Sequence, residues 1–306
     1  VVEAAPGSAR AVAIGAPFAV PAGARSRVIA AGEQARLEVA IDPADHPDHP
    51  ALAAAIAASP LLALAADPAT ADVRLVARAG AWHVGDALHP VCTLAAHQLD
   101  RARAVLEHYL AYARPIRMAA QIAGAGGELG DGLALRVLLV PREVRALTEG
   151  ATRSVSDVRG LLPEARSPGS GVYTLGAGET ICFEVHNQTC VPLVVTLVNA
   201  AASGKVAVLA EHAISPGKRD LFWFRNQIFA PFAVTPPAGE AAGTDRVIAF
   251  GRAADQGSLG FLAVDHGFAD VVRGHGAAPV VDPGPVRGDG GAAWTASQAV
   301  LHVQAD

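Results

Sequence analysis

The chain has 306 residues, of which 51% are hydrophobic and 17% are charged, and its formal net charge is −5. This much apolar surface excludes a disordered chain and is enough for two domains of ordinary size. The cations are scattered along a chain of negative net charge, which excludes the basic footprint of a protein that binds duplex nucleic acid.

The sequence also argues against a membrane protein or a secreted protein. No apolar run reaches the roughly 18 residues of a membrane-spanning helix, because the best one, 51–66, is interrupted by Pro60. The first residue is valine and no signal peptide is visible, so we expect a piece of a longer protein. Three cysteines, an odd number, favour a reducing cytoplasm over a disulfide framework.

The first half of the chain mixes strand-like and helix-like patterns. Apolar and polar residues alternate, as in half-buried strands, over 35–41, 72–78 and 133–140. One helix is predicted from Pro50, because a first helical turn tolerates proline. A second is predicted within 99–113, where apolar residues recur at intervals of three and four. We therefore predict an α+β domain over residues 1–147.

The second half follows a polar segment and contains only strand-like patterns. Residues 148–170 are mostly polar and end in Ser-Pro-Gly-Ser, which is typical of a linker. Short apolar segments separated by Gly- and Pro-containing turns then follow at 179–185, 191–198, 205–210, 246–250 and 297–304. This spacing predicts an all-β sandwich domain over residues 171–306.

Two polar clusters can be interpreted as metal sites. Segment 42–50 holds His46 and His49 among carboxylates and prolines, but it has no second ligand pair at zinc-like spacing, so we expect a solvated loop. Cys182 and Cys190 flank a predicted two-residue hairpin turn at 187–188. The turn places the two thiols on different faces, so we expect packing residues and neither a disulfide nor a metal.

Asp265-His266-Gly267 follows an apolar segment, an arrangement that fits a catalytic histidine at the end of a strand. A cysteine protease needs a thiolate within hydrogen-bond reach of that imidazole. The sequence has no Gly-x-Ser-x-Gly elbow for a serine nucleophile either. We therefore expect no catalytic residue in this chain. A hydrolase that uses His266 or the 42–50 loop is the alternative.

The segment Gly217–Phe229, GKRDLFWFRNQIF, concentrates aromatic and cationic residues in a chain with only 5% aromatics. If 219–225 is a strand, Phe222 and Phe224 face the core, while a tryptophan flanked by two arginines faces outward. Trp stacks on a nucleobase and Arg forks a phosphate, whereas cross-strand cation–π packing without a ligand is the alternative. A Gly-Thr-Asp-Arg turn can add a ribose acceptor and a third cation. The predicted ligand-binding residues are Arg219, Trp223, Arg225, Asn226, Gln227, Asp245 and Arg246.

Segments 178–211, 215–218 and 236–251 resemble a domain of unknown function at the C-termini of bacterial caspase-like proteases. The resemblance rests on a strand after Gly-Glu, an Asn-x-x-x-Ser-Gly-Lys turn, a Pro-Gly turn and the Gly-Thr-Asp-Arg segment. Segments 71–90 and 99–119 resemble the region that joins protease and terminal domain in that family. The family's catalytic His-Gly precedes its Asp-x-Cys cysteine, whereas all three cysteines here precede His266. The catalytic dyad is therefore not carried over, and the protease domain is expected upstream.

The resemblance implies a sensor that switches on an upstream caspase-like protease in antiphage defence. In Thoeris-type systems the signal is a small nucleotide made by a TIR-domain partner, so the implied ligand is a cyclic ADP-ribose isomer, with no other cofactor. The alternative is a structural, oligomerising or substrate-docking module that makes only protein contacts. Nucleotides should raise the thermal stability of a sensor, whereas such a module would only assemble and a metal-dependent hydrolase would lose activity with a chelator.

Overall fold

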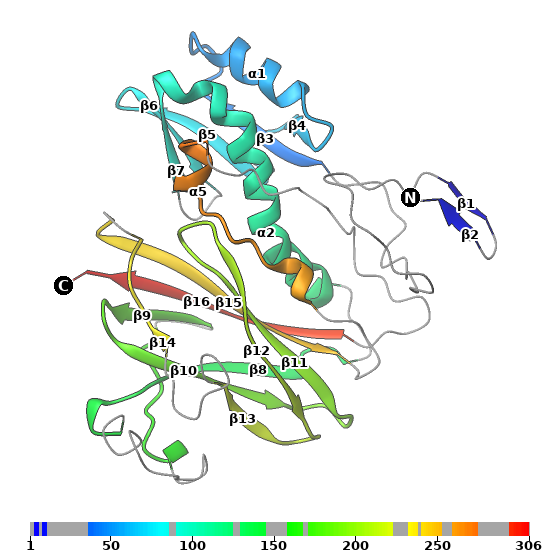
Figure 1. Cartoon of the computed structure of the whole chain (residues 1–306), viewed down its shortest axis with the longest axis vertical. Helices are drawn as coiled ribbons and strands as arrows, with labels where there is room; N and C mark the ends of the chain where they lie inside the picture. Colours follow the sequence, from blue (N-terminus) through cyan, green and yellow to red (C-terminus); the bar gives the residue numbers. More distant parts are fainter. Residues whose placement is uncertain are drawn as a thin grey trace.

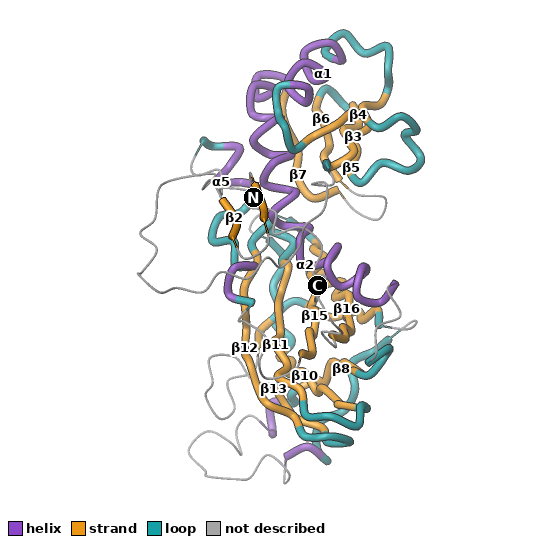
Figure 2. Tube along the Cα trace, turned by 90° about the vertical axis from the view of Figure 1, so that its right-hand side faces the viewer, coloured by secondary structure: helices purple, strands orange, loops and turns teal. Residues whose placement is uncertain are grey.

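The protein is described by a computed structural model, which covers residues 3–5, 8–10, 36–85, 90–124, 129–144, 158–167, 171–222, 232–237, 240–252, 259–274 and 294–305. These residues form an α+β part followed by a β-sandwich, as the sequence predicts (Figure 1). The two parts lie end to end along the long axis of the molecule, and one long helix spans the junction (Figure 2). Within the described residues no helix is both long and apolar enough to cross a membrane.

The α+β part is built on a five-stranded mixed sheet, here called the N-terminal sheet. Its strand order is β4-β3-β5-β6-β7, with β3 parallel to β4 and β5 and the other pairs antiparallel. The helix α1 connects β3 to β4, as a parallel pair requires. The elements are β3 (Leu37–Asp42), α1 (His49–Ala57), β4 (Leu62–Leu64), β5 (Val73–Arg78), β6 (Ala81–Gly85) and β7 (Pro90–Ala95). A short ribbon pairs β1 (Glu3–Ala5) with β2 (Ser8–Arg10).

The helix that spans the junction is α2 (Ala102–Gly124), which follows the 3₁₀ turn η1 (Ala96–Arg101) and contains Pro115. The predicted apolar stripe is confirmed, because Ala102, Leu106 and Leu110 are buried. One cluster of buried side chains joins this stripe to the N-terminal sheet and to Val198, Ile248 and other residues of the sandwich. A single apolar core therefore runs across the junction between the two parts.

The sandwich consists of two sheets. The large sandwich sheet has the order β12-β11-β15-β16-β9, and in the small sandwich sheet β10 pairs with β8 along one edge and with β13 and β14 along the other. Inward residues of both sheets form the second core, and α2 covers the opposite face of the large sheet. The strands are β8 (Leu133–Leu139), β9 (Val172–Gly176), β10 (Thr180–Asn187), β11 (Leu193–Ala200), β12 (Val206–Ile214), β13 (Arg219–Phe222), β14 (Phe232–Ala233), β15 (Ala242–Arg252) and β16 (Trp294–Gln304).

The predicted hairpin turn at 187–188 is wrong, because β10 and β11 belong to different sheets. The cause is Asn187, which is fully buried and donates from Nδ2 to the carbonyls of Val191 and Ile214, at 2.9 and 3.0 Å. Its Oδ1 accepts the backbone N–H of Thr189 at 3.0 Å. These bonds turn the chain from one sheet into the other. Cys182 and Val185 do lie on opposite faces of β10, as predicted.

The strand β8 and the segment after it lie on the sandwich. The predicted boundary at 147 assigns β8 to the N-terminal part, whereas its seven residues pair in register with β10. Within the predicted linker 148–170, the described residues 158–167 lie along the free edge of β8. Leu139 N–H donates to the Pro163 carbonyl at 2.8 Å, and Ala165 N–H donates to the Val137 carbonyl at 2.9 Å. This stretch is therefore docked.

Two short helices complete the described chain next to α2. The 3₁₀ turn η3 (Gly260–Leu262) leads to α5 (Phe268–Val272), and Phe268 packs edge-on against His108 and Tyr112 of α2. The N–H of Phe268 donates to the carbonyl of Ser203 at 2.8 Å, in the turn between β11 and β12. Helices α2 and α5 are thus fixed to the same end of the large sandwich sheet.

Candidate functional site

The predicted ligand-binding strand begins in the structure as β13, at the edge of the small sandwich sheet. Phe222 is 1% exposed and packs in the sandwich core, as predicted for the inward face. Leu221 is also 1% exposed, on the opposite face, where it packs with Val158, Leu162 and Cys182. The outward face of β13 is therefore covered by the docked stretch 158–167 at this position. The predicted ligand residues Trp223, Arg225, Asn226 and Gln227, and Phe224, lie outside the described residues.

Arginines converge on one buried carboxylate on this outward face. Glu184 of β10 is 5% exposed. Its Oε2 accepts from Arg159 Nε at 2.5 Å, and its Oε1 accepts from Arg219 Nη1 at 3.3 Å. Arg136 of β8 stands directly opposite Glu184 in the strand register, where side chains are neighbours. We call Arg136, Arg159, Glu184 and Arg219 the Glu184 cluster.

Two further carboxylates lie near the Glu184 cluster. Glu164 Oε2 lies 4.0 Å from Arg136 Nη1, and the charge of Arg159 helps to lower the pKa of Asp220. Among the described residues, Arg159 Nη2 has no hydrogen-bond partner. Arg carries five donors in a fixed fork, and the Arg159 side chain is 36% exposed, so it has donors beyond the one that Glu184 uses.

A second charged pair lies beside the cluster, where β12 and β13 meet at the open side of the sandwich. His212 Nδ1 is 2.9 Å from Asp220 Oδ2, and the His212 ring stacks on Phe222 with a centroid distance of 4.4 Å. The hydrogen bond from His212 is the largest cause of a lowered pKa for the Asp220 carboxyl, and the charges of His212 and Arg159 act in the same direction. This carboxylate stays ionised and holds the edge of β13 against β12.

Asp245 and Arg246, predicted to join Arg219 in one pocket, lie elsewhere. They belong to β15 in the large sheet, where Arg246 stands opposite Ala200 at the end of β11. Arg219 lies near the start of β11, next to the end of β10, so the length of β11 separates the two places by roughly 20 Å. Asp245 also has a structural role, because it accepts the Ala202 N–H at 2.7 Å. Burial raises the pKa of its carboxyl.

The 42–50 loop is tied to the N-terminal sheet by its own polar groups. His46 Nδ1 accepts the Asp48 N–H at 3.2 Å, and Trp82 Nε1 donates to Asp48 Oδ2 at 3.2 Å. The His46 ring packs edge-on against Trp82 at 4.7 Å. Throughout the described part of the chain, no group of three or more His, Cys, Asp or Glu side chains is placed to hold a metal ion.

The three cysteines occupy separate places. Cys182 is buried under the 158–167 stretch, which raises its pKa to about 12, and Cys92 on β7 has a pKa raised by burial to about 11. Cys190 is exposed between β10 and β11. His266, proposed as an alternative catalytic residue, is exposed in the loop before α5.

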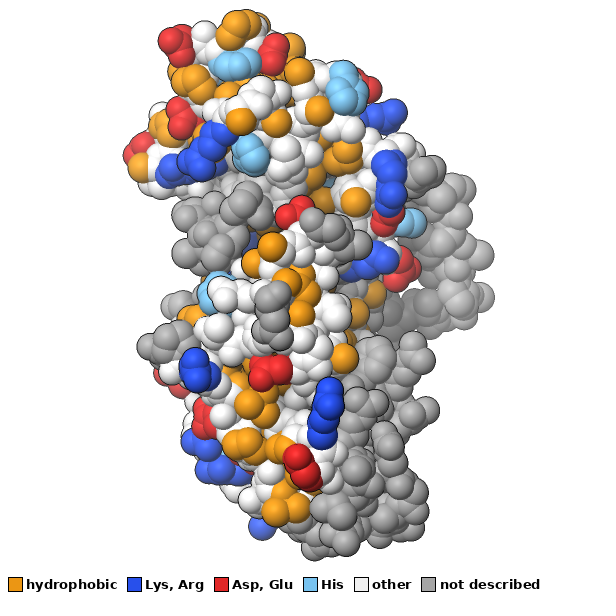
Figure 3. Space-filling view, turned by 90° about the vertical axis from the view of Figure 1, so that its left-hand side faces the viewer, with side chains coloured by type: hydrophobic (Ala, Val, Ile, Leu, Met, Phe, Trp, Pro, Cys, Tyr) orange, Lys and Arg blue, Asp and Glu red, His pale blue; other side chains and the backbone are white. Residues whose placement is uncertain are grey.

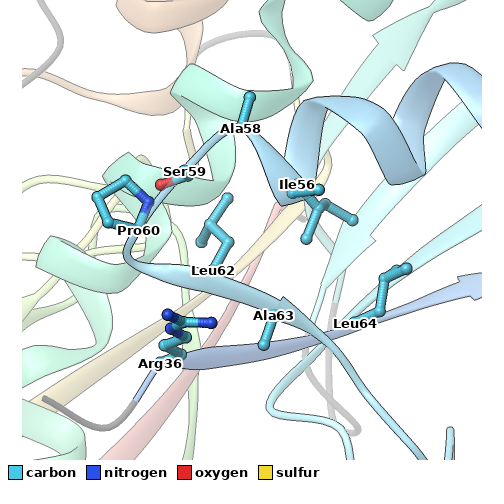
Figure 4. Close-up of a pocket in the computed structure, with 9 residues that line it drawn as sticks. Arg36, Ile56, Ala58, Ser59, Pro60, Leu62, Ala63 and Leu64 are labelled. Carbon is cyan, nitrogen blue, oxygen red and sulfur yellow. The ribbon is translucent and has the colours of Figure 1, made fainter. Parts of the chain in front are cut away.

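No sequence pattern indicates a groove that lies at the edge of the N-terminal sheet. It has a volume of about 530 Å³ and lies between the end of α1 and the edge strand β4. Ile56 lies on one side of β4 and Arg36 on the other (Figure 4). Strand order decides where a sheet has an open edge, and no local pattern encodes strand order. Arg159 and Glu184 were missed as well, although Val158 and Leu162 in the supposed linker have the four-residue spacing of an apolar helix face.

No family model, no curated protein and no solved structure matches this chain. The resemblance to the C-terminal region of caspase-like proteases therefore stays a hypothesis.

On one face of the molecule, acidic and basic side chains are interspersed over both parts of the chain (Figure 3).

Proposed function

We propose that this chain is a non-catalytic regulatory module that binds a small anionic nucleotide at the Glu184 cluster. The observation that carries the proposal is a group of three arginines around one buried carboxylate. Arg159 and Arg219 bond to Glu184, Arg136 stands opposite it in the strand register, and Arg159 Nη2 has no hydrogen-bond partner among the described residues. A phosphate oxygen accepts hydrogen bonds from guanidinium groups, and its negative charge attracts them. This support is independent of the family resemblance.

The residues that follow the cluster in the sequence supply what a nucleotide needs besides phosphate contacts. The chain passes from Phe222 directly into Trp223 and Arg225, and a tryptophan ring stacks on any nucleobase. Asn226 and Gln227 can then hydrogen-bond a base edge. The proposed ligand class is a nucleotide with one base and a pyrophosphate, such as ADP-ribose or one of its cyclic isomers.

The docked stretch offers a route from ligand to regulation. Arg159 is held by Glu184 on one side and stands beside Val158, which packs under Leu221. A phosphate that binds the guanidinium of Arg159 competes with Glu184 for it. This competition weakens the ion pair that helps to fix the stretch to the small sandwich sheet. Within the proposal, that change is the signal to an upstream caspase-like protease domain of the same protein.

The environments of two cysteines support a non-catalytic role. A nucleophilic cysteine must be a thiolate near neutral pH. Burial raises the pKa of Cys92 to about 11 and that of Cys182 to about 12, so both thiols stay protonated. Cleavage of casein by the purified chain, abolished by His266→Ala or Cys182→Ala, would contradict this part of the proposal.

The test is a thermal-shift panel with cyclic ADP-ribose isomers, ADP-ribose and NAD, followed by calorimetry of any nucleotide that stabilises the chain. We expect one of them to raise the melting temperature, because a ligand that binds only the folded state stabilises it. The double substitution Trp223→Ala, Arg225→Ala should abolish the shift. If no nucleotide stabilises the chain while light scattering shows self-association, the structural-module alternative replaces this proposal.

A further inference from the structure

The groove at the edge of the N-terminal sheet exposes backbone groups of a strand. Among the described residues, β4 pairs with β3 alone, and its other edge meets no described strand. Leu37 N–H donates to the Leu61 carbonyl and Ala65 N–H donates to the Val39 carbonyl, both at 2.9 Å. In a strand, backbone groups alternate between the two edges, so those of Leu62 and Leu64 point away from β3. The Leu62 N–H donates to the Ser59 carbonyl at 3.5 Å, which leaves the Leu62 carbonyl and both backbone groups of Leu64 for a further strand. Leu64 is 46% exposed.

The two walls of the groove differ in chemistry. On one side of β4 the end of α1 presents the exposed Ala57 and Ala58, followed by the exposed Pro60, over the buried Ile56. On the other side lie Ala63 and the guanidinium of Arg36 (Figure 4). Arg36 is exposed, and it has no hydrogen bond or ion pair with any described residue. One wall is therefore apolar, and the other carries a single cation.

We propose that β4 accepts an extended peptide of a partner protein as an added strand. An added strand bonds to the Leu62 carbonyl and to the backbone groups of Leu64, and its side chains alternate between the two walls. The peptide must therefore alternate apolar residues, which lie on the exposed Ala57, Ala58 and Pro60, with polar residues, one of which is a carboxylate facing Arg36. This pattern distinguishes the partner from the nucleotide ligand of the Glu184 cluster, which lies on the small sandwich sheet.

The groove has space for such a peptide. A volume of about 530 Å³ holds a few residues of an extended chain, and three residues of β4 set the length over which backbone pairing is available. The hydroxyl of Ser59 donates to Glu107 Oε1 on α2 at 2.8 Å and fixes the turn between α1 and β4. The site is thus rigid at its closed end, which limits the ordering that binding requires.

The test measures fluorescence anisotropy of the complete chain with the labelled peptide Thr-Val-Glu-Val-Thr-Val-Thr. Two derivatives carry N-methyl groups on alternate backbone amides, either on the valines or on the other residues. Only one set of amides faces β4, so we expect one derivative to bind about tenfold more weakly or worse, while the other keeps its affinity. Equal binding by both derivatives, or no saturable binding at millimolar peptide, would overturn the proposal.

Variants of the chain test the walls separately. Arg36→Gln should weaken binding roughly two- to fivefold and remove any preference for Glu over Gln in the peptide. Arg78→Gln, an exposed arginine on the same sheet, should change neither. Leu64→Glu should abolish binding by placing a carboxylate in the groove. The melting temperature of Leu64→Glu is measured alongside. If this variant does not fold, the result for Arg36→Gln alone tests the groove. Equal effects of Arg36→Gln and Arg78→Gln would overturn the role of Arg36.

Discussion

Gly204→Ala should lower the free energy of unfolding, because an alanine at this position is unfavourable for two separate reasons. Gly204 lies in the turn between β11 and β12 with φ +86°, a conformation that costs an L-residue about 1–2 kcal/mol. An added Cβ would also stand 2.4 Å from Cδ2 of Phe268. That ring is confined, since it packs against His108 and Tyr112 at centroid distances of 5.0 and 5.5 Å.

The second cost follows from this confinement. Forcing an extra methyl group against a ring that cannot move costs about 1–3 kcal/mol. The total loss for Gly204→Ala is therefore about 2–5 kcal/mol. Gly217→Ala is the matched control, because Gly217 also has a positive φ, +66°, but an added Cβ there meets no atom within 4 Å. It should lose only the backbone part, about 1–2 kcal/mol.

Urea unfolding followed by circular dichroism measures both losses on the same chain. The difference between the two variants reports how firmly α5 and α2 are seated on the β11–β12 turn. If Gly204→Ala and Gly217→Ala lose the same free energy of unfolding, Phe268 does not fill the space above Gly204. The single core across the junction would then be incorrect.

Three further outcomes follow from the surroundings of single side chains. Burial lowers the pKa of His108 below its ordinary 6.5, so the unfolded chain binds a proton that the folded chain excludes. The free energy of unfolding should fall as pH drops below 6.5, and His108→Gln should flatten that fall. A pH profile of stability that is the same for His108→Gln and the unaltered chain would contradict this prediction. In the native chain, the exposed Cys190 should react fast with DTNB, and Cys190→Ser should abolish this fast phase. A fast phase that survives Cys190→Ser would mean that Cys92 or Cys182 is exposed. Asn187→Ala should cost about 1–3 kcal/mol in urea unfolding, because the carbonyl of Ile214 loses a buried hydrogen bond; a loss under about 0.5 kcal/mol would refute this.

The alternation of apolar residues was enough to predict most strands and the two faces of β10. Ile181, Phe183 and Val185 lie in the sandwich core because a period of two puts them on one side. The apolar stripe of α2 follows in the same way from a period near 3.6. These patterns report which side of an element is buried, and they are local.

Partners in space are not local, and this is where sequence reasoning failed. The pattern of β8 is the same whether it pairs in the first part or, as observed, with β10. Nothing around Asn187 indicates that its side chain turns the chain into another sheet. The Glu184 cluster joins residues from β8, β10, β13 and a stretch interpreted as a linker, so only the folded chain reveals it.

The most direct test of nucleotide binding at the Glu184 cluster compares the Kd of Arg159→Gln with that of the unaltered chain by calorimetry. The probes are cyclic ADP-ribose isomers, ADP-ribose and NAD, and Arg78→Gln is the control. We expect one nucleotide to bind, and we expect Arg159→Gln to raise its Kd roughly tenfold or more through the loss of a charge-assisted hydrogen bond. Arg78→Gln should leave the Kd unchanged. Binding of none of the probes, or equal affinities for Arg159→Gln and the unaltered chain, would contradict the proposal.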